Sequence, residues 1–321
     1  MSFAGKPPSL RAHTFAGRAR TLPPAAVCAP NASRSRPFPV VFWRGLPPAR
    51  HNSYNAAPQA RCGVAARRRW SRARTGPPVN PIVIIPARMA STRLPGKPLA
   101  DIAGTPMIVR VAEQARSAEV GPVAVATDAP EIAEAVTRAG FQAVMTRADH
   151  PSGSDRVHEA AGLLDPAGTH DVLLNLQGDL PLIDPASVRA AASVLEASQA
   201  DIATLAARIV EDDERTNPNV VKAVVSSLGA GAMRALYFTR ATAPWGDGDL
   251  WHHIGIYAWR RDALARFVSL PPSPLEQRER LEQLRALEHG MSIAVAAVDT
   301  VPFGVDTPED LERARALLAK G

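Results

Sequence analysis

The apolar positions of this chain form two kinds of pattern from residue 82 onward. Ile82 to Ile85 are continuously apolar, which is typical of a strand buried on both faces of a parallel sheet. Pro86 is expected to end that strand because it has no N–H group. In residues 105–118 the apolar residues recur at helical spacing, with Thr105 as the N-cap and Pro106 as the first helical residue. Alternating strands and helices predict an α/β fold with right-handed crossovers in a parallel sheet.

The alternation continues toward the end of the chain. Helices are expected at residues 130–139 and 185–198, and strands at residues 123–127, 143–146, 172–176, 202–209, 220–226, 235–239, 253–257 and 292–298.

Three helix starts carry capping signals. Asp184 precedes a proline and reads as an N-cap, and Thr307 does the same with Asp310 three residues later. Ser273 and Glu276 form a capping box, and that helix is expected to continue through residues 281–285. Capping alone therefore explains Asp184 and Glu276 without any functional role.

Residues 1–80 differ from the rest in composition. They hold 14 Lys and Arg residues, no Asp or Glu, and 12 of the 30 prolines, so we expect a disordered leader. It could be an organellar transit peptide, or a basic arm at residues 67–70 that touches nucleic acid or anionic lipid. The third reading, which we favour, is that the leader is not part of the native protein. In this reading the assigned start codon lies too far upstream, and native translation begins at Val79. N-terminal sequencing of the native protein would reject that reading if the leader were intact.

Charge and cysteine usage exclude several classes of function. Residues 81–321 hold 31 acidic and 37 − 14 = 23 basic residues, a net charge of −8, so the basic average does not indicate nucleic-acid binding by the folded part. Cys28 and Cys62 both lie in the leader, so the folded part has no disulfide, thiolate nucleophile or Cys–zinc site. No apolar run approaches the roughly 20 residues of a membrane span.

The loop after the first strand carries three cations. Arg88, Arg93 and Lys97 are spaced among small residues that let a ligand approach the backbone, including Ser91 and Gly96. A cationic loop at the carboxyl end of a first strand suits a nucleotide phosphate. Neither the Walker A nor the dinucleotide glycine pattern is present.

The run P-A-R-M-A-S-T-R-L-P-G-K-P at residues 86–98 resembles the sugar-activating cytidylyltransferases, and most of all the 3-deoxy-manno-octulosonate (Kdo) cytidylyltransferase family. Further family-like segments follow in order at residues 177–179, 217–222, 253–257, 272–276 and 304–311. The resemblance implies one nucleotidyltransferase-type, Rossmann-like domain at residues 81–321, with a mostly parallel mixed sheet flanked by helices. It also implies a homodimer in the cytoplasm, or in an organelle if the leader is a transit peptide. The implied enzyme uses CTP and Mg²⁺ to activate Kdo as CMP-Kdo for lipopolysaccharide biosynthesis.

The resemblance also assigns site residues. Those implied to bind CTP are Ala87, Arg88, Arg93, Lys97, Arg147, Ser152 and Gln177. Those implied to bind Kdo are Gln177, Arg240, His253, Gly255, Tyr257, Glu276 and Gln283. Arg88, Lys97, Asp179 and Asp306 are the implied catalytic residues.

Two acids are candidate Mg²⁺ ligands. Asp179 follows Gly178 at the end of a buried strand, where a carboxylate can reach a metal on a nucleotide. Asp306 is spare because Thr307 already supplies the next N-cap. Leu180 stands where the family form has Glu, and the connection from Trp245 to Trp251 is shorter than in relatives.

Three alternatives stay open. One is a cytidylyltransferase for another acceptor, such as an amino-substituted Kdo or a polyol phosphate. The second is an inactive nucleotide-binding subunit, against which the joint presence of Lys97, Asp179 and Asp306 argues. The third is a nucleic-acid binder that depends entirely on the leader.

Overall fold

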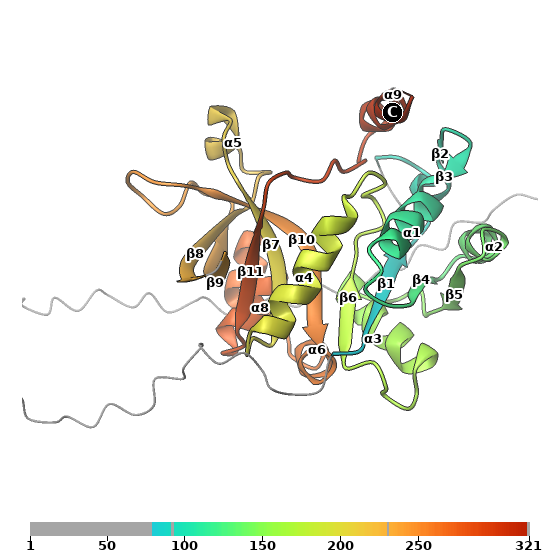
Figure 1. Cartoon of the computed structure of the whole chain (residues 1–321), viewed down its shortest axis with the longest axis horizontal. Helices are drawn as coiled ribbons and strands as arrows, with labels where there is room; N and C mark the ends of the chain where they lie inside the picture. Colours follow the sequence, from blue (N-terminus) through green and yellow to red (C-terminus); the bar gives the residue numbers. More distant parts are fainter. Residues whose placement is uncertain (1–78, 91–92, 230, 320–321) are drawn as a thin grey trace, which may run out of the picture. The chain divides into compact units, whose positions relative to one another are not determined.

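The computed structural model describes residues 79–90, 93–229 and 231–319. A nine-stranded sheet runs through this part of the chain in the order β5-β4-β1-β6-β10-β7-β11-β9-β8 (Figure 1). The pairings give seven of these strands one direction, and β9 and β10 run the opposite way. The expected α/β fold with a mostly parallel mixed sheet is therefore confirmed.

The strands are β1 (Pro81–Ala87), β4 (Val123–Thr127), β5 (Gln142–Met145), β6 (Val172–Asn175), β7 (Ile202–Arg208), β8 (Lys222–Gly229), β9 (Ala232–Thr239), β10 (Trp251–Arg260) and β11 (Ile293–Val298), with β2 (Asp101–Ile102) and β3 (Thr105–Pro106) in a separate hairpin. The helices are α1 (Met107–Ser117), α2 (Pro130–Arg138), α3 (Gly153–Leu164), α4 (Pro185–Ala197), α5 (Asp212–Thr216), α6 (Arg261–Val268), α7 (Pro274–Glu279), α8 (Gln283–Glu288) and α9 (Pro308–Leu318), with a 3₁₀ turn η1 (Lys97–Leu99).

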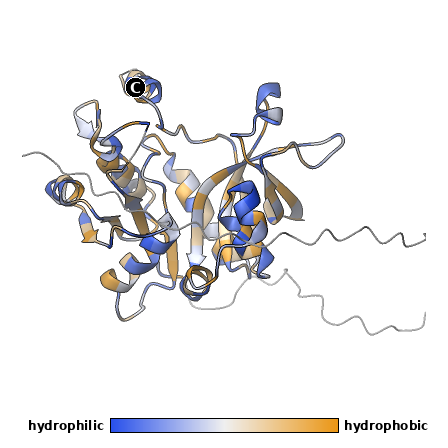
Figure 2. Ribbon diagram, turned by 180° about the vertical axis from the view of Figure 1, so that it is seen from behind, coloured by the Kyte–Doolittle hydropathy of each residue, from blue (hydrophilic) through white to orange (hydrophobic). Residues whose placement is uncertain are grey.

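Apolar cores lie on both faces of the sheet, because alternate residues of a strand point to opposite sides. Val83 and Ile85 of β1 pack with α1, α2 and α4, whereas Ile82 and Ile84 pack with α3, α6 and α8. All four side chains are buried, which confirms the prediction from their continuous apolar run. Figure 2 shows the consequence: the central strands are mainly hydrophobic, while the helices carry both colours.

A third core joins the C-terminal helix to the loop region after β1. Ile102 and Met107 pack against Val305, Leu311 and Ala314, and Figure 1 shows α9 beside the β2–β3 hairpin. The Arg315 guanidinium donates to the Asp101 carbonyl from Nη2 at 2.7 Å and from Nε at 2.9 Å. The end of the chain thus packs against the segment that carries the cationic loop.

Two expectations near β1 are wrong. Pro86 does not end the strand: β1 continues to Ala87, since its pairing with β4 extends to Thr127 while its pairing with β6 stops at Ile84. Pro86 therefore lies where only one neighbouring strand is paired, as edge prolines do. Thr105 is not an N-cap either, because it pairs with Ile102 in the β2–β3 hairpin and α1 begins at Met107.

The capping predictions are largely confirmed. The Asp184 carboxylate accepts from the Ala186 N–H at 2.8 Å, and the Thr307 hydroxyl accepts from the Asp310 N–H at 3.2 Å. The continuous helix expected from residue 274 to residue 285 is wrong. Arg280 adopts a left-handed conformation with φ of 55°, which ends α7 and lets α8 start in a new direction.

The inferences about the leader concern residues 1–80, of which residues 1–78 lie outside the described part of the chain. Within the described residues, no helix combines the length and the apolar character that a membrane crossing requires.

Candidate active site

The carboxyl ends of four neighbouring parallel strands meet at one edge of the sheet. From β1 the chain moves to β4 and then β5 on one side, and it later returns to β6 on the other side of β1. Ligands of open α/β sheets bind at such a reversal of strand order, outside the carboxyl ends. The loops after β1, β5 and β6 all leave from this edge.

The β1–α1 loop presents Lys97 at this edge. Gly96 takes a left-handed conformation with φ of 67°, which glycine adopts without strain, and the turn η1 begins immediately after it. Pro98 is buried and anchors the turn. The Lys97 side chain is only 13% exposed, so its ammonium group lies against the protein and not in bulk water.

Asp179 and Asp306 approach each other through a backbone contact. The Val305 N–H donates to the Asp179 carbonyl at 2.9 Å, which ties the segment before α9 to the loop after β6. Lys97 Nζ then lies 2.9 Å from Asp179 Oδ2 and 2.8 Å from Asp306 Oδ1. Arg93 Nη2 lies 3.2 Å from the other oxygen of Asp306. Two acids that are far apart in sequence thus share one cation.

These contacts set the charge state of Lys97. Burial alone would lower the pKa of its ammonium group, but the Coulombic attraction and hydrogen bonds of Asp179 and Asp306 outweigh burial and raise that pKa above 10.5. Lys97 is therefore a fixed positive charge at neutral pH.

A cavity of about 430 Å³ opens at this site. Its wall includes eight of the predicted site residues: Ala87, Arg88, Arg93, Lys97, Ser152, Gln177, Asp179 and Asp306. Ser91, named as part of the loop, lies outside the described residues. Arg147 is not in the wall: its side chain is exposed, with Nε 3.8 Å from both Asp149 Oδ1 and Glu159 Oε1.

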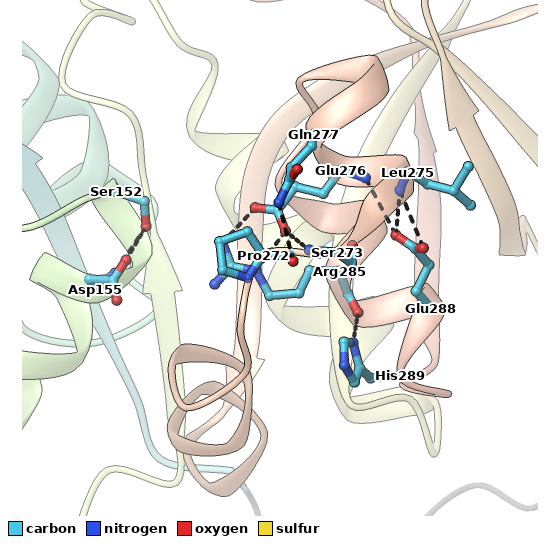
Figure 3. Close-up of polar contacts among 10 residues, drawn as sticks. All are labelled: Ser152, Asp155, Pro272, Ser273, Leu275, Glu276, Gln277, Arg285, Glu288 and His289. Atoms are coloured by element: carbon cyan, nitrogen blue, oxygen red, sulfur yellow. Dashed lines mark hydrogen bonds and ion pairs between the residues drawn. The ribbon is translucent and has the colours of Figure 1, made fainter. Parts of the chain in front are cut away.

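The N-terminus of α3 forms another side of the cavity. Ser152 caps the helix, accepting from the Asp155 N–H at 3.3 Å and donating to its carboxylate at 2.6 Å (Figure 3). Gly153 follows as the first residue of α3 and also lines the cavity. The first N–H groups of a helix favour negative charge and hydrogen-bond acceptors.

His150 and Arg156 also line the cavity, although the sequence did not single them out. Arg156 is buried, donates to Thr146 Oγ1 at 2.6 Å and lies 3.3 Å from Asp128 Oδ2. His150 pairs through Nε2 with the Glu159 carboxylate. The available signal was their position in residues 146–156, a Ser- and Gly-containing segment that leads into the first turn of α3.

The comparisons with known proteins agree with this geometry. A family model described as cytidylyltransferase matches residues 82–293. A 3-deoxy-manno-octulosonate cytidylyltransferase of Azorhizobium caulinodans is 69% identical over 238 residues, which cover 74% of this chain and 95% of that relative. The chain belongs to the 3-deoxy-manno-octulosonate cytidylyltransferase family.

Other members and solved structures fit the same assignment. The 3-deoxy-manno-octulosonate cytidylyltransferase of Parvibaculum lavamentivorans is 66% identical, covering 75% of this chain and 93% of its own length. A solved CMP:2-keto-3-deoxy-manno-octonic acid synthetase complexed with CTP is 41% identical, with a TM-score of 0.69 over 75% of this chain and 99% of that one. A cytidylyltransferase from Leptospira borgpetersenii is 18% identical with a TM-score of 0.51 and supports the fold alone.

One of the residues that the resemblance assigns to the sugar connects the cavity to β10. Gln177 is the link, since it lines the cavity and its Nε2 donates to the Gly255 carbonyl at 3.2 Å. His253 is buried, with Nε2 3.1 Å from Thr204 Oγ1 and Nδ1 3.5 Å from Gln283 Nε2. Of the predicted sugar residues, Gln177 alone belongs to the cavity wall formed by the described residues.

Burial controls the protonation of this neighbourhood. Burial, followed by the charge of His252, lowers the pKa of His253 to about 3, so its ring is neutral. Burial and the Glu282 carboxylate raise the pKa of Tyr257, so its hydroxyl remains a donor. Burial also raises the pKa of Glu282, which bonds to Ser154 at the start of α3 and was not named from the sequence. Glu282 thus connects the start of α8 to the first turn of α3.

Glu276 and Arg240 already have partners in this cytidylyltransferase. Glu276 accepts from the Ser273 N–H at 2.9 Å and from Arg285 Nε at 2.8 Å, as Figure 3 shows. Arg240 donates through Nε to the Glu279 carbonyl at 2.9 Å and through Nη1 to the Pro218 carbonyl at 3.0 Å. Their assignments to the sugar therefore stay predictions.

The acid pair suits a hard divalent cation. Asp179 and Asp306 already share one cationic atom, Lys97 Nζ, at hydrogen-bond distance, and this ammonium stands in for a positive ion between them. Residues 79–90, 93–229 and 231–319 contain no cluster of three or more His, Cys, Asp or Glu that could hold a metal. Mg²⁺ typically takes only one or two carboxylates and completes its shell with phosphate oxygens and water.

Proposed function

We propose that this protein transfers a cytidylyl group from CTP to Kdo, yielding CMP-Kdo and pyrophosphate for lipopolysaccharide biosynthesis. The observation that carries the proposal is the cavity at the strand-order reversal, which gathers Arg88, Arg93 and Lys97 beside Asp179 and Asp306. The 69% identical relative that is named for this activity supports it.

The chain's own groups suit the nucleotide. Arg88, Arg93 and Lys97 offer positive charge to the triphosphate, and Lys97 stabilises charge that develops on the α-phosphate and on the leaving pyrophosphate. The N–H groups at the start of α3 lie on another side of the cavity and suit acceptors of the cytidine. The triphosphate would thus be held along the β1–α1 loop with its α-phosphorus facing the sugar.

Asp179 and Asp306 would hold Mg²⁺ in this proposal. When bound, Mg²⁺ neutralises phosphate charge and lowers the pKa of a hydroxyl that it orients. The anomeric hydroxyl of Kdo would lose its proton to water and attack the α-phosphorus in line, so that a P–O bond to the sugar forms while the bond to pyrophosphate breaks. Asp179, tied to Val305, and Gln177, tied to Gly255, lie on the loop between the cavity and β10.

The sugar would lie between the cavity and β10. In the proposal, five residues line or support the space for the sugar: Gln177, Gly255, His253, Tyr257 and Gln283. Arg240 and Glu276 would contribute only if they exchange their present partners for substrate. A carboxylate sugar needs a cation, and an arginine is suited to bind it through two parallel hydrogen bonds.

Pyrophosphate release by the full chain tests the function. CTP, Mg²⁺ and Kdo are expected to give release, and Asp306→Asn is expected to abolish most of it. Asp184→Asn is the matched control, because Asp184 caps α4 away from the cavity and asparagine caps equally well. Release with an amino-substituted Kdo but not with Kdo would overturn the proposed substrate. Failure of every acceptor despite CTP binding would favour a nucleotide-binding role.

We also propose a homodimer in the cytoplasm. Trp245 is 100% exposed, and Leu228 of β8 and Leu236 of β9 are exposed as well, so these apolar side chains are our candidates for the contact between two copies. Light scattering of the full chain is expected to give twice the monomer mass. A monomer at micromolar concentration would contradict the dimer, and recovery in a membrane fraction would contradict the location.

A further inference from the structure

Four charged side chains form a closed ion-pair group at the cavity wall. Lys97 bridges Asp179 and Asp306 at 2.9 and 2.8 Å, and Arg93 pairs with Asp306 at 3.2 Å. The group has two positive and two negative charges, so its net charge is zero. Arg88 lines the same cavity but forms no ion pair with a described carboxylate.

In the proposed function the same four side chains have different partners, namely the metal ion and the nucleotide. Asp179 and Asp306 would hold the metal, whereas Arg93 and Lys97 would bind the triphosphate. An ammonium ion and a divalent cation cannot both lie between the two carboxylates, because they would need the same oxygen atoms and would repel each other. The ion pairs inside the protein therefore compete with both ligands.

We propose that Lys97 is an internal counter-cation that prevents divalent metal from binding to the free protein. Metal and nucleotide then bind as a linked pair. The triphosphate gives Lys97 and Arg93 new partners, which frees the carboxylates, and the metal gives the carboxylates a new partner, which frees the cations. This inference rests on the proposed function for the roles of the two acids.

Partial burial makes the competition effective. Asp179 is 35% exposed and Lys97 is 13% exposed, so water and salt screen this pair less than a surface pair. The Asp306 side chain is 48% exposed and is held from two sides, by Lys97 and by Arg93. A metal ion must displace the Lys97 ammonium to reach both carboxylates at once.

Binding of Mn²⁺ to the full chain, without nucleotide, tests the role of Lys97. Electron paramagnetic resonance of free Mn²⁺ gives the affinity directly. Lys97→Met is expected to raise Mn²⁺ affinity by about tenfold, which lies within the usual range of coupling between sites. Lys97→Arg keeps the charge and is expected to bind Mn²⁺ as weakly as the wild type. Arg88→Met removes a cavity charge that touches neither acid, and it is expected to change the affinity by less than about twofold.

The reciprocal measurement uses CTP without metal. Loss of the Asp306 carboxylate removes the ion-pair partner of Arg93 and one of the two partners of Lys97, so the triphosphate has less competition for these cations. In the presence of EDTA, Asp306→Asn is expected to bind CTP about fivefold more tightly than the wild type. The matched variant Asp184→Asn is expected to bind CTP with unchanged affinity. This result runs against the simple expectation that losing a metal ligand only weakens the site.

Two outcomes would overturn the inference. One is equal Mn²⁺ affinity for Lys97→Met and the wild type, with both proteins showing cooperative thermal unfolding. The other is unchanged or weaker metal-free CTP binding by Asp306→Asn. Both measurements need no turnover, so inactivity toward Kdo would reject the proposed function while leaving the ion-pair competition intact.

Discussion

The buried imidazole of His253 predicts how the stability of this protein depends on pH. Its pKa is about 3 in the folded protein against an ordinary value of 6.5, because burial excludes the charged ring. Below pH 6.5 the imidazole of His253 binds a proton in the unfolded chain but stays unprotonated in the folded chain. Stability is therefore lost as the pH falls from 6.5 toward 3, and the loss is complete below that window.

The magnitude follows from the two pKa values. Each unit of difference corresponds to about 1.4 kcal/mol, so the full effect across the window approaches roughly 5 kcal/mol. Between pH 7 and pH 5 the contribution of His253 to the free energy of unfolding falls by about 2 kcal/mol. That is a large fraction of the stability of a typical domain.

His253→Gln removes the titration and keeps a polar side chain that can donate to Thr204. Urea unfolding at pH 7, 6 and 5 is expected to show that the variant loses about 2 kcal/mol less than the wild type across this range. His289→Gln removes an exposed imidazole and is measured beside it as the control. Parallel stability curves for wild type and His253→Gln would refute the assignment of a neutral, buried His253.

Three further predictions follow from single contacts. Leu174→Ala, at a fully buried position of β6, is expected to lower the free energy of unfolding by about 2–5 kcal/mol in urea titrations. Gly178→Val would place a Cβ 3.0 Å from the Pro86 carbonyl, so the loop that carries the metal-ligand candidate must shift, and pyrophosphate release is expected to fall by about a hundredfold or more. Backbone hydrogen bonds from residues 169 and 170, together with Arg261, lower the pKa of Asp165 to about 2. The wild type therefore loses stability as the pH falls from 4 to 2, because this carboxylate becomes protonated. Asp165→Asn is expected to show a smaller fall of the melting temperature over the same pH range in thermal unfolding.

The wall of the cavity could be predicted from sequence to a large extent. Six of the seven residues implied to bind CTP line the cavity, and Arg147 is the exception. They are close in space because they belong to the end of β1 and to the loops after β1, β5 and β6, which meet at one edge of the sheet. Arg147 is also in such a loop, but its N–H and side chain turn toward Glu159 on the outer surface of α3.

The sugar side was less accessible to sequence reasoning. His253 and Glu276 belong to recognisable motifs, yet the structure commits each to internal partners, Thr204 for one and Arg285 for the other. Glu282 was overlooked because a Glu in a charged helical segment resembles any solvated side chain. Its partial burial beside Ser154 of α3, which only the tertiary structure produces, raises its pKa.

Local chemistry determined what the sequence could establish by itself. The continuous apolar run of β1, the N-caps at Asp184 and Thr307, and the cationic loop each depend on residues within a few positions of one another. Their conformations follow from side-chain sterics, capping hydrogen bonds and burial, which neighbouring residues already specify.

Tertiary structure alone decided which distant groups meet. The hydrogen bond from Val305 to Asp179 brings Asp306 to Lys97 across 209 positions of sequence, and no local pattern encodes that distance. Pro86 stays in a strand because β4 pairs with it, and Thr105 joins a hairpin because Ile102 lies opposite. These outcomes depend on strand order and on the packing of α9, where long-range contacts outweigh local preference.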